Sequence, residues 1–102
     1  MTNRLIYISH PCTSCGDIEE NRQQARQFAD KYKKQGYHVI NPLEVINPES
    51  SYAEAMDISY RLLSICDAIA MCGNWKQSTG CFEEFNYALC NNKEVIYDGG
   101  MK

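Results

Sequence analysis

Apolar residues fall into four short runs along the chain. The runs cover residues 4–9 (RLIYIS), 37–41 (YHVIN), 67–72 (DAIAMC) and 94–97 (EVIY). Each run contains β-branched residues and is closely followed by Pro or Gly, which is typical of strands rather than of short buried helices. The sequence therefore predicts four short strands.

The stretch after the first strand predicts an amphipathic helix. Its apolar residues form one stripe among Gln, Arg and Lys, made of Ile18, Ala25, Phe28, Ala29 and Tyr32. These positions share one face at helical spacing. Asp17 and Glu20 have the spacing of a capping box at the start of this helix, and Gly36 is expected to end it.

Two further helices are predicted. Ser51 and Glu54 form a capping box that opens the second helix, which ends near Ile65. The third helix lies within residues 75–89. Residues 43–51, between the second strand and the second helix, are predicted as a loop with some extended character.

Strands that alternate with amphipathic helices indicate an α/β fold. We predict a small doubly wound parallel sheet of the flavodoxin or Rossmann type, with about four strands, helices on both faces and a single domain over residues 1–102. In such a sheet, ligands bind beyond the carboxyl ends of the strands. The polar segments expected there are residues 9–17, 41–51, 74–80 and 98–100.

The last predicted helix carries two adjacent glutamates with different surroundings. Its apolar face consists of Cys81, Phe82, Phe85, Ala88 and Leu89. Glu83 points away from this face and is expected to be solvated, whereas Glu84 falls on its border. We therefore expect Glu84 to be the carboxylate that is held, partly desolvated, in a cleft.

Ser78, Thr79 and Gly80 precede this helix. Hydroxyl groups and an open backbone at a helix start can bind an anion, because the first N–H groups are free and the helix dipole is positive there. Ser78 can also act only as an N-cap. In the anion interpretation, a phosphate site lies about one and a half turns from Glu84.

Other polar residues near the predicted ligand edge have two interpretations each. Asp57 lies in the second turn of the second helix, within reach of this edge, but an exposed ion pair with Arg61 four residues later is the alternative. Asn74 and Trp75 follow the third strand, and Trp75 either stacks on a base or covers the edge of the core.

Charge and composition exclude several classes of function. The net charge of −3, without a strongly basic cluster, disfavours nucleic-acid binding. No apolar run is long enough for a signal peptide or a membrane span, so a cytoplasmic protein is expected. Four of the six cysteines lie in apolar runs and are expected to be reduced core residues, namely Cys66, Cys72, Cys81 and Cys90.

Cys12 and Cys15 form a CxxC after the first strand. A redox pair or half of a zinc site would have this spacing. A zinc site is disfavoured because there is no second CxxC and no nearby His pair. A redox site is disfavoured because a thioredoxin-like site has a helix that starts at its first cysteine, and no such helix is predicted here. We therefore predict neither a metal nor a cofactor.

The motifs IYIS, YHVINP, CDAIAM and GNW occur in this order, followed by Ser78-x-Gly80 and by Glu84 four residues after the glycine. This order resembles the nucleoside 2-deoxyribosyltransferase superfamily over nearly the whole chain, and more narrowly a group of small uncharacterised proteins within it. The resemblance implies that Glu84 attacks the anomeric carbon of a deoxyribose and forms a glycosyl-enzyme ester. A carboxylate suits this role because it stabilises and traps an oxocarbenium-like carbon.

The resemblance also implies a substrate. Ser78 stands where nucleoside transferases of the superfamily tend to carry Asp and where 5′-monophosphate N-glycosidases carry a phosphate-binding Ser, which favours a nucleotide. Tyr7 and Ser9 are implied as substrate contacts. In relatives, an aspartate on the second helix is the leaving-group acid. It lies about two residues closer to the aspartate of the CDAI motif than Asp57 does here. Homo-oligomeric assembly is implied as well.

Two hypotheses follow. In the first, the protein cleaves the N-glycosidic bond of a 2′-deoxynucleoside, with the 5′-monophosphate favoured, or transfers its deoxyribosyl group, with Glu84 as nucleophile and Asp57 as acid. In the second, the protein is a non-catalytic module that binds nucleotides in the same pocket. The sequence indicates neither the preferred base nor the choice between hydrolysis and transfer.

Overall fold

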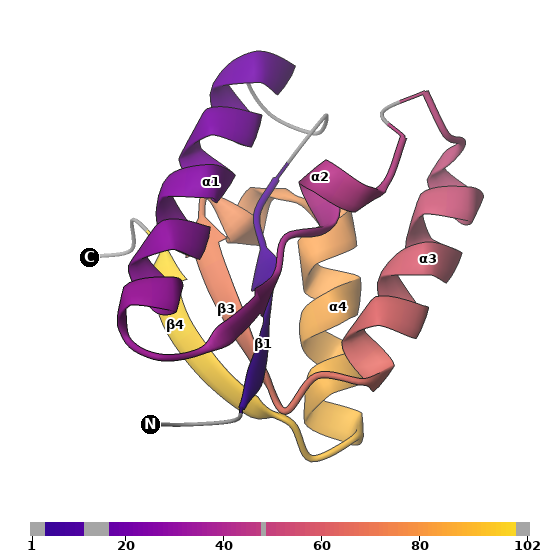
Figure 1. The fold of residues 1–102 in the computed structure, drawn as a ribbon. Helices are drawn as coiled ribbons and strands as arrows, with labels where there is room; N and C mark the ends of the chain where they lie inside the picture. The colour runs from indigo at the N-terminus through magenta and orange to yellow at the C-terminus, as the bar shows by residue number, and fades with distance from the viewer. Residues whose placement is uncertain (1–3, 12–16, 48, 100–102) are drawn as a thin grey trace.

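The computed structural model describes residues 4–11, 17–47 and 49–99. Its elements, in chain order, are β1 (Leu5–Ser9), α1 (Ile18–Lys34), β2 (His38–Ile40), α2 (Pro42–Val45), α3 (Tyr52–Ser64), β3 (Ala68–Gly73), the 3₁₀ turn η1 (Trp75–Gln77), α4 (Thr79–Cys90) and β4 (Glu94–Gly99) (Figure 1). Among the described residues no helix is long and apolar enough to cross a membrane.

The strands form one parallel sheet in the order β2-β1-β3-β4. The chain moves outward from β1 to β2 and then crosses back to β3, so the strand order reverses between β1 and β3. In open α/β sheets, this reversal opens a crevice at the carboxyl ends of the two strands. The predicted α/β fold class is confirmed.

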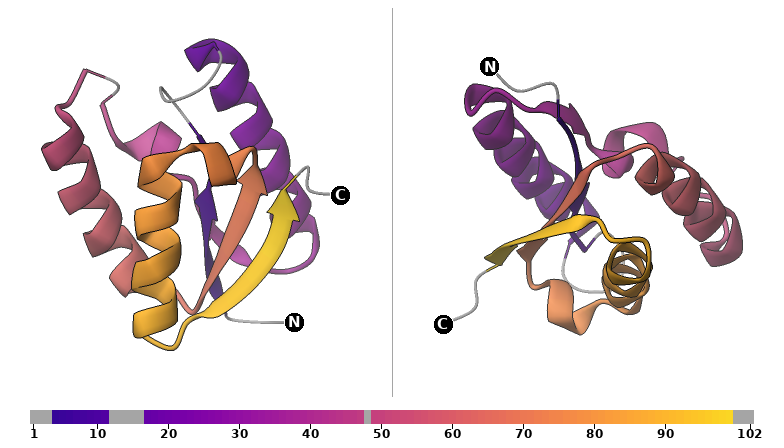
Figure 2. Two further views of the ribbon diagram at one scale, coloured as in Figure 1. Left: turned by 180° about the vertical axis from the view of Figure 1, so that it is seen from behind. Right: turned by 90° about the horizontal axis from the view of Figure 1, so that it is seen from below.

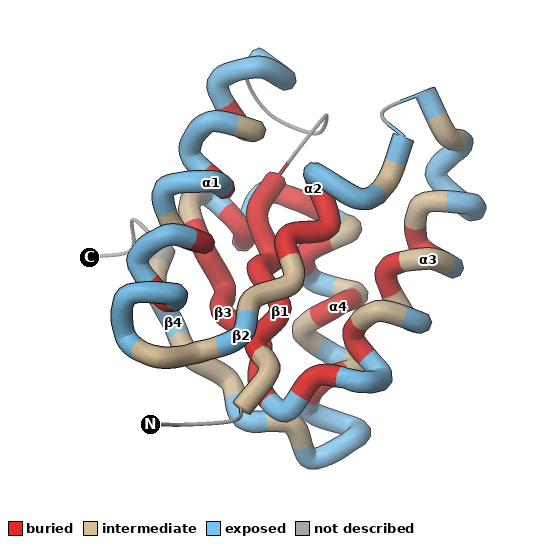
Figure 3. Tube along the Cα trace, viewed as in Figure 1, coloured by how far each residue is buried: buried red, intermediate tan, exposed pale blue. Residues whose placement is uncertain are grey.

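Helices cover both faces of the sheet, with α1 on one side and α4 on the other (Figure 2). The α1 side packs Ile6 and Ile8 of β1 against Ala29 and Tyr32. The opposite side packs Tyr7, Ile69, Met71 and the α4 residues Cys81 and Ala88 around Leu63 of α3. Buried residues are concentrated in β1, β3 and the inward faces of the helices (Figure 3).

Several local predictions are confirmed. Ser51 and Glu54 form the predicted capping box at the start of α3, and the Ser78 side chain caps α4. Gly36 follows the last turn of α1 with a φ of 99°, a left-handed conformation that favours glycine.

Other local predictions are wrong. The predicted loop over residues 43–51 is wrong in its first part, where the short helix α2 forms; Ile46 and Ser51 are extended as expected. Pro42 at the first helical position and the Asn41 side chain, which accepts a hydrogen bond from the Leu43 N–H (3.2 Å), start this helix. Asp17 precedes α1 but makes no side-chain cap hydrogen bond. Cys90 is exposed rather than buried.

Candidate active site

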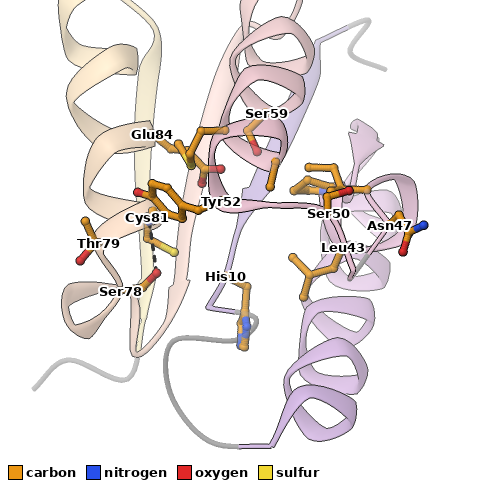
Figure 4. Close-up of a pocket in the computed structure, with 15 residues that line it drawn as sticks. His10, Leu43, Asn47, Ser50, Tyr52, Ser59, Ser78, Thr79, Cys81 and Glu84 are labelled. Atoms are coloured by element: carbon orange, nitrogen blue, oxygen red, sulfur yellow. Dashed lines mark hydrogen bonds between the residues drawn. The ribbon is translucent and has the colours of Figure 1, made fainter.

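A pocket of about 390 Å³ opens at the carboxyl edge of the sheet, between α4 on one side and α2 and α3 on the other (Figure 4). The α4 wall is largely polar and consists of Ser78, Thr79, Gly80, Cys81 and Glu84. The facing wall is largely apolar and includes Pro42, Leu43, Ile46, Ala55 and Met56. A pocket of this size with a few convergent polar groups is typical of small-molecule sites.

Glu84 lies in this pocket with 7% of its surface exposed. The Tyr7 hydroxyl donates a hydrogen bond to Oε2 (2.7 Å), and the Ser9 hydroxyl donates one to Oε1 (2.7 Å). Burial raises the pKa of the Glu84 carboxyl, because desolvation disfavours the charged form, while hydrogen bonds from Ser9, Tyr7 and Ser59 act in the opposite direction. The carboxylate is thus desolvated and fixed in orientation.

The alternation of side chains along β1 explains this arrangement. Successive residues of a strand point to opposite faces of the sheet, so Ile6 and Ile8 face α1 while Tyr7 and Ser9 face Glu84. Burial, with the nearby Glu84 charge as a smaller cause, raises the pKa of Tyr7 well above its usual value. Tyr7 therefore remains a neutral hydrogen-bond donor across the physiological pH range.

The start of α4 forms one end of the pocket. The Ser78 hydroxyl is buried and accepts a hydrogen bond from the Cys81 N–H (3.3 Å), so it caps the helix. This bond uses the oxygen as an acceptor and leaves its hydrogen available to a ligand. Gly80 faces the α3 side of the pocket, since a Cβ there would lie 3.6 Å from the Met56 sulfur and 3.9 Å from Tyr52 Cε1, both ordinary contact distances.

Two of the sequence-predicted substrate contacts lie behind Glu84. Tyr7 and Ser9 are fully buried, and both bond to its carboxylate rather than line the pocket. The structure therefore brings them to the site as residues that orient Glu84.

Three other predicted site residues lie away from the pocket. Trp75 is 3% exposed, and its ring packs against Phe82 (5.3 Å between centroids) and Phe85 (5.2 Å), so it covers the core edge. Asn74 is exposed at the start of η1. Asp57 has 61% of its side chain exposed and pairs with Arg61 at 3.1 Å, which is the alternative arrangement considered for it.

Residues 4–97 match a sequence family described as a domain of unknown function, DUF4406. The chain belongs to the DUF4406 family. No curated protein sequence matches it.

The DUF4406 fold is similar to a solved structure described as a 2-desoxiribosyltransferase from Leishmania mexicana, with a TM-score of 0.71 and 18% sequence identity. The likeness covers 96% of this chain but only 65% of the other. At this identity, the comparison establishes a shared fold.

Two aromatic pocket residues of this DUF4406 chain escaped the sequence analysis. Tyr52 lines the pocket and donates its hydroxyl hydrogen to Glu83 Oε1 (2.5 Å), so Glu83 is not simply solvated. One sequence signal could have identified Tyr52 as a pocket residue. It directly follows the Ser51 cap, in a helix that starts at the edge of the sheet where ligands bind. The sequence pattern instead indicated a packing residue.

His10 is the second residue that was missed. It lines the pocket directly after β1 and is 5% exposed. Its Nδ1–H donates to the Pro11 carbonyl (2.8 Å), and Nε2 lies 3.2 Å from Gln24 Oε1. A Cβ at Gly73 would lie 2.7 Å from Nε2, so the glycine makes room for the ring.

Among the described residues of this DUF4406 chain, no group of three or more His, Cys, Asp and Glu side chains could hold a metal ion. Cys12 and Cys15 lie outside the described residues.

Proposed function

We propose that this protein cleaves the N-glycosidic bond of a 2′-deoxynucleoside, preferably as its 5′-monophosphate, or transfers the deoxyribosyl group to a second base. The observation that carries the proposal is Glu84, a buried carboxylate that faces a pocket while hydroxyl groups from β1 hold both of its oxygens. The fold shared with a 2-desoxiribosyltransferase supports the same reaction class.

In the proposed reaction, the bond between C1′ and the base nitrogen breaks, and its electron pair leaves with the base, which takes up a proton from the solvent. One carboxylate oxygen of Glu84 bonds to C1′ and forms a glycosyl ester, as in retaining glycoside cleavage. Water or a second base then attacks C1′ and releases the carboxylate. Tyr7 and Ser9 orient Glu84 for the attack, since productive geometry accounts for a large part of such rate enhancements.

The start of α4 supports a 5′-phosphate as the anionic end of the substrate. Ser78, Thr79 and Gly80 line the pocket about one and a half turns from Glu84 along the helix. The first N–H groups of a helix have no partner within it and can bind an anion. Among the described lining residues there is no lysine or arginine. The proposed phosphate site therefore uses hydroxyl groups, main-chain N–H groups and the helix dipole.

The proposed reaction is tested by incubating the purified protein with deoxynucleoside monophosphates and measuring the free base released. Glu84→Gln keeps the shape of the side chain and should abolish release. Undiminished release by this variant would contradict the role of Glu84.

The phosphate preference is tested by two substitutions at Ser78. Ser78→Ala should raise KM for the monophosphate about tenfold more than KM for the nucleoside, because it removes a hydrogen bond to a charged group. Ser78→Asp keeps an N-cap but adds negative charge. This variant should still bind the nucleoside but should no longer bind the monophosphate. Equal effects on both substrates would indicate that Ser78 acts only as a cap.

A non-catalytic nucleotide-binding module is the second candidate function. The observation that favours it is the position of Asp57, the proposed leaving-group acid, whose exposed side chain pairs with Arg61 and does not line the pocket. This candidate predicts that a monophosphate binds with no release of base. Calorimetric binding together with the base-release assay therefore separates the two functions.

A further inference from the structure

Tyr52 presents an aromatic ring to the pocket from the first turn of α3. The side chain reaches from α3 toward α4, where its hydroxyl meets Glu83, and Figure 4 shows it among the residues that line the pocket. Its ring carbon Cε1 would lie 3.9 Å from a Cβ at Gly80, one helical turn before Glu84. The ring thus borders the part of the pocket in front of the buried carboxylate.

A single strong hydrogen bond holds this ring in place. The Tyr52 hydroxyl donates to Glu83 Oε1 at 2.5 Å, a charge-assisted bond that joins α3 to α4. The hydrogen bond to Glu83 is also the main reason that the pKa of Tyr52 rises to about 12. The hydroxyl therefore stays protonated, and Glu83 serves to hold the ring at the wall of the pocket.

Tyr52 is only partly covered by the protein. The residue is 55% exposed although it lines a pocket. The other ring among the described lining residues is His10, which already packs against Phe28 with the two ring centroids 5.8 Å apart. Trp75, the aromatic residue expected from sequence, is buried in the core edge.

We propose that Tyr52 is the base-stacking residue of this pocket and that Glu83 is its positioning residue. The inference rests on the proposed function in taking the ligand to be a nucleotide or nucleoside. With C1′ against Glu84, the base attached to that carbon lies within reach of the Tyr52 ring. Ala55 and Met56 extend the same wall with apolar surface suited to a planar base.

The test compares two ligands that differ by the base alone. A deoxynucleoside 5′-monophosphate and 2-deoxyribose 5-phosphate are titrated into Glu84→Gln protein, where the former should remain intact. Tyr52→Ala in this background should weaken nucleotide binding by about tenfold, within the range found for base stacking on aromatic side chains. Binding of the sugar phosphate should change less than about twofold, because the stacking contribution requires a base.

Further variants separate the ring from its tether and from the helix. Tyr52→Phe and Glu83→Gln keep the ring but weaken or remove its anchor, so each should cost less nucleotide affinity than Tyr52→Ala. Tyr60→Ala is the matched control, because Tyr60 lies on the same helix but stacks on Tyr87, with 5.1 Å between centroids, and does not line the pocket. It should leave the affinities for both ligands unchanged.

Equal losses of both ligands in Tyr52→Ala, or no loss of either, would overturn the stacking role and leave the proposed reaction standing. A nucleotide-selective loss in a protein that never releases base would support stacking while refuting the reaction. Failure of the nucleotide to bind the parent protein would overturn the inference.

Discussion

The two sides of strand β1 differ in what they bury. On the α1 side, Ile6 and Ile8 pack among small apolar residues such as Ala29, Ala68 and Ala70. On the opposite side, the alternate residues of the same strand are Tyr7 and Ser9, and both bond to the buried Glu84.

The difference follows from how the helices lie on the sheet. The α1 helix packs directly on β1, β2 and β3, whereas α3 packs mainly against α4. A pocket lies between α3 and α4 at the carboxyl edge (Figure 4). A desolvated carboxylate lowers stability unless hydrogen bonds compensate it. The α1 side of β1 therefore stabilises the fold, while the opposite side holds a polar site at the expense of stability.

Truncation on the α1 side should have the largest effect on stability. Ile8 is fully buried, so Ile8→Ala should lower the free energy of unfolding by about 2–5 kcal/mol. Denaturant unfolding monitored by circular dichroism measures this change. Base release per folded molecule should stay near the parent value, and a large selective loss of activity would contradict the separation of the two sides.

Replacing the buried carboxylate should change how the stability of the protein depends on pH. The folded-state pKa of Glu84 is raised above its ordinary value of 4.5, so the folded protein binds more protons than the unfolded chain within that interval. Stability conferred by this residue is therefore lost as the pH rises from 4.5 through the folded-state pKa. Glu84→Gln does not titrate and should gain stability relative to the parent across this window.

Paired unfolding curves at several pH values test this prediction, since the other titrating groups cancel in the difference between the two proteins. A constant difference between parent and variant at all pH values would show that Glu84 does not titrate across the window. A lower stability of Glu84→Gln at neutral pH would show that the ionised carboxylate stabilises the fold.

The sequence predicted much of this fold because its local signals agree with one another. The capping box at Ser51, the Ser78 cap and the alternation of strands with helices all point to the observed topology. Glu84 was predicted from its place on the border of an apolar helix face, and the structure buries it in a pocket.

The rest of the site depends on tertiary packing, which helical spacing does not encode. Trp75 turns toward Phe82 and Phe85 because η1 folds back on the core edge. Tyr52 meets Glu83 across two helices, and no pattern within either helix indicates this contact. The alternation of side chains along β1 could be recognised in the sequence. Only the structure shows that its polar side faces Glu84.

Removing a donor on the polar side should shift the pH dependence of activity. The Ser9 hydroxyl bonds to Glu84 and lowers the pKa of that carboxyl against the dominant effect of burial. Ser9→Ala should raise that pKa further, so the loss of base release on acidification should begin at higher pH.

The pH profile of kcat/KM, measured for Ser9→Ala and for the parent, tests this shift. Ser9→Thr keeps the hydroxyl and serves as the control that should restore the parent profile. A lower rate with an unchanged acidic limb would mean that Ser9 affects the site without influencing the ionisation of Glu84.

The smallest effect is expected at Asp57, on the outward face of α3. Its side chain is mostly exposed and pairs with Arg61 one turn along the helix at 3.1 Å. Exposed pairs of this spacing contribute about 0.3–0.5 kcal/mol, so Asp57→Asn should barely change stability. Base release should change less than about twofold, because a proton donor must lie within hydrogen-bond reach of the leaving base. A loss of a hundredfold or more, confined to substrates with poor leaving groups, would instead show that Asp57 leaves Arg61 and protonates the base during turnover.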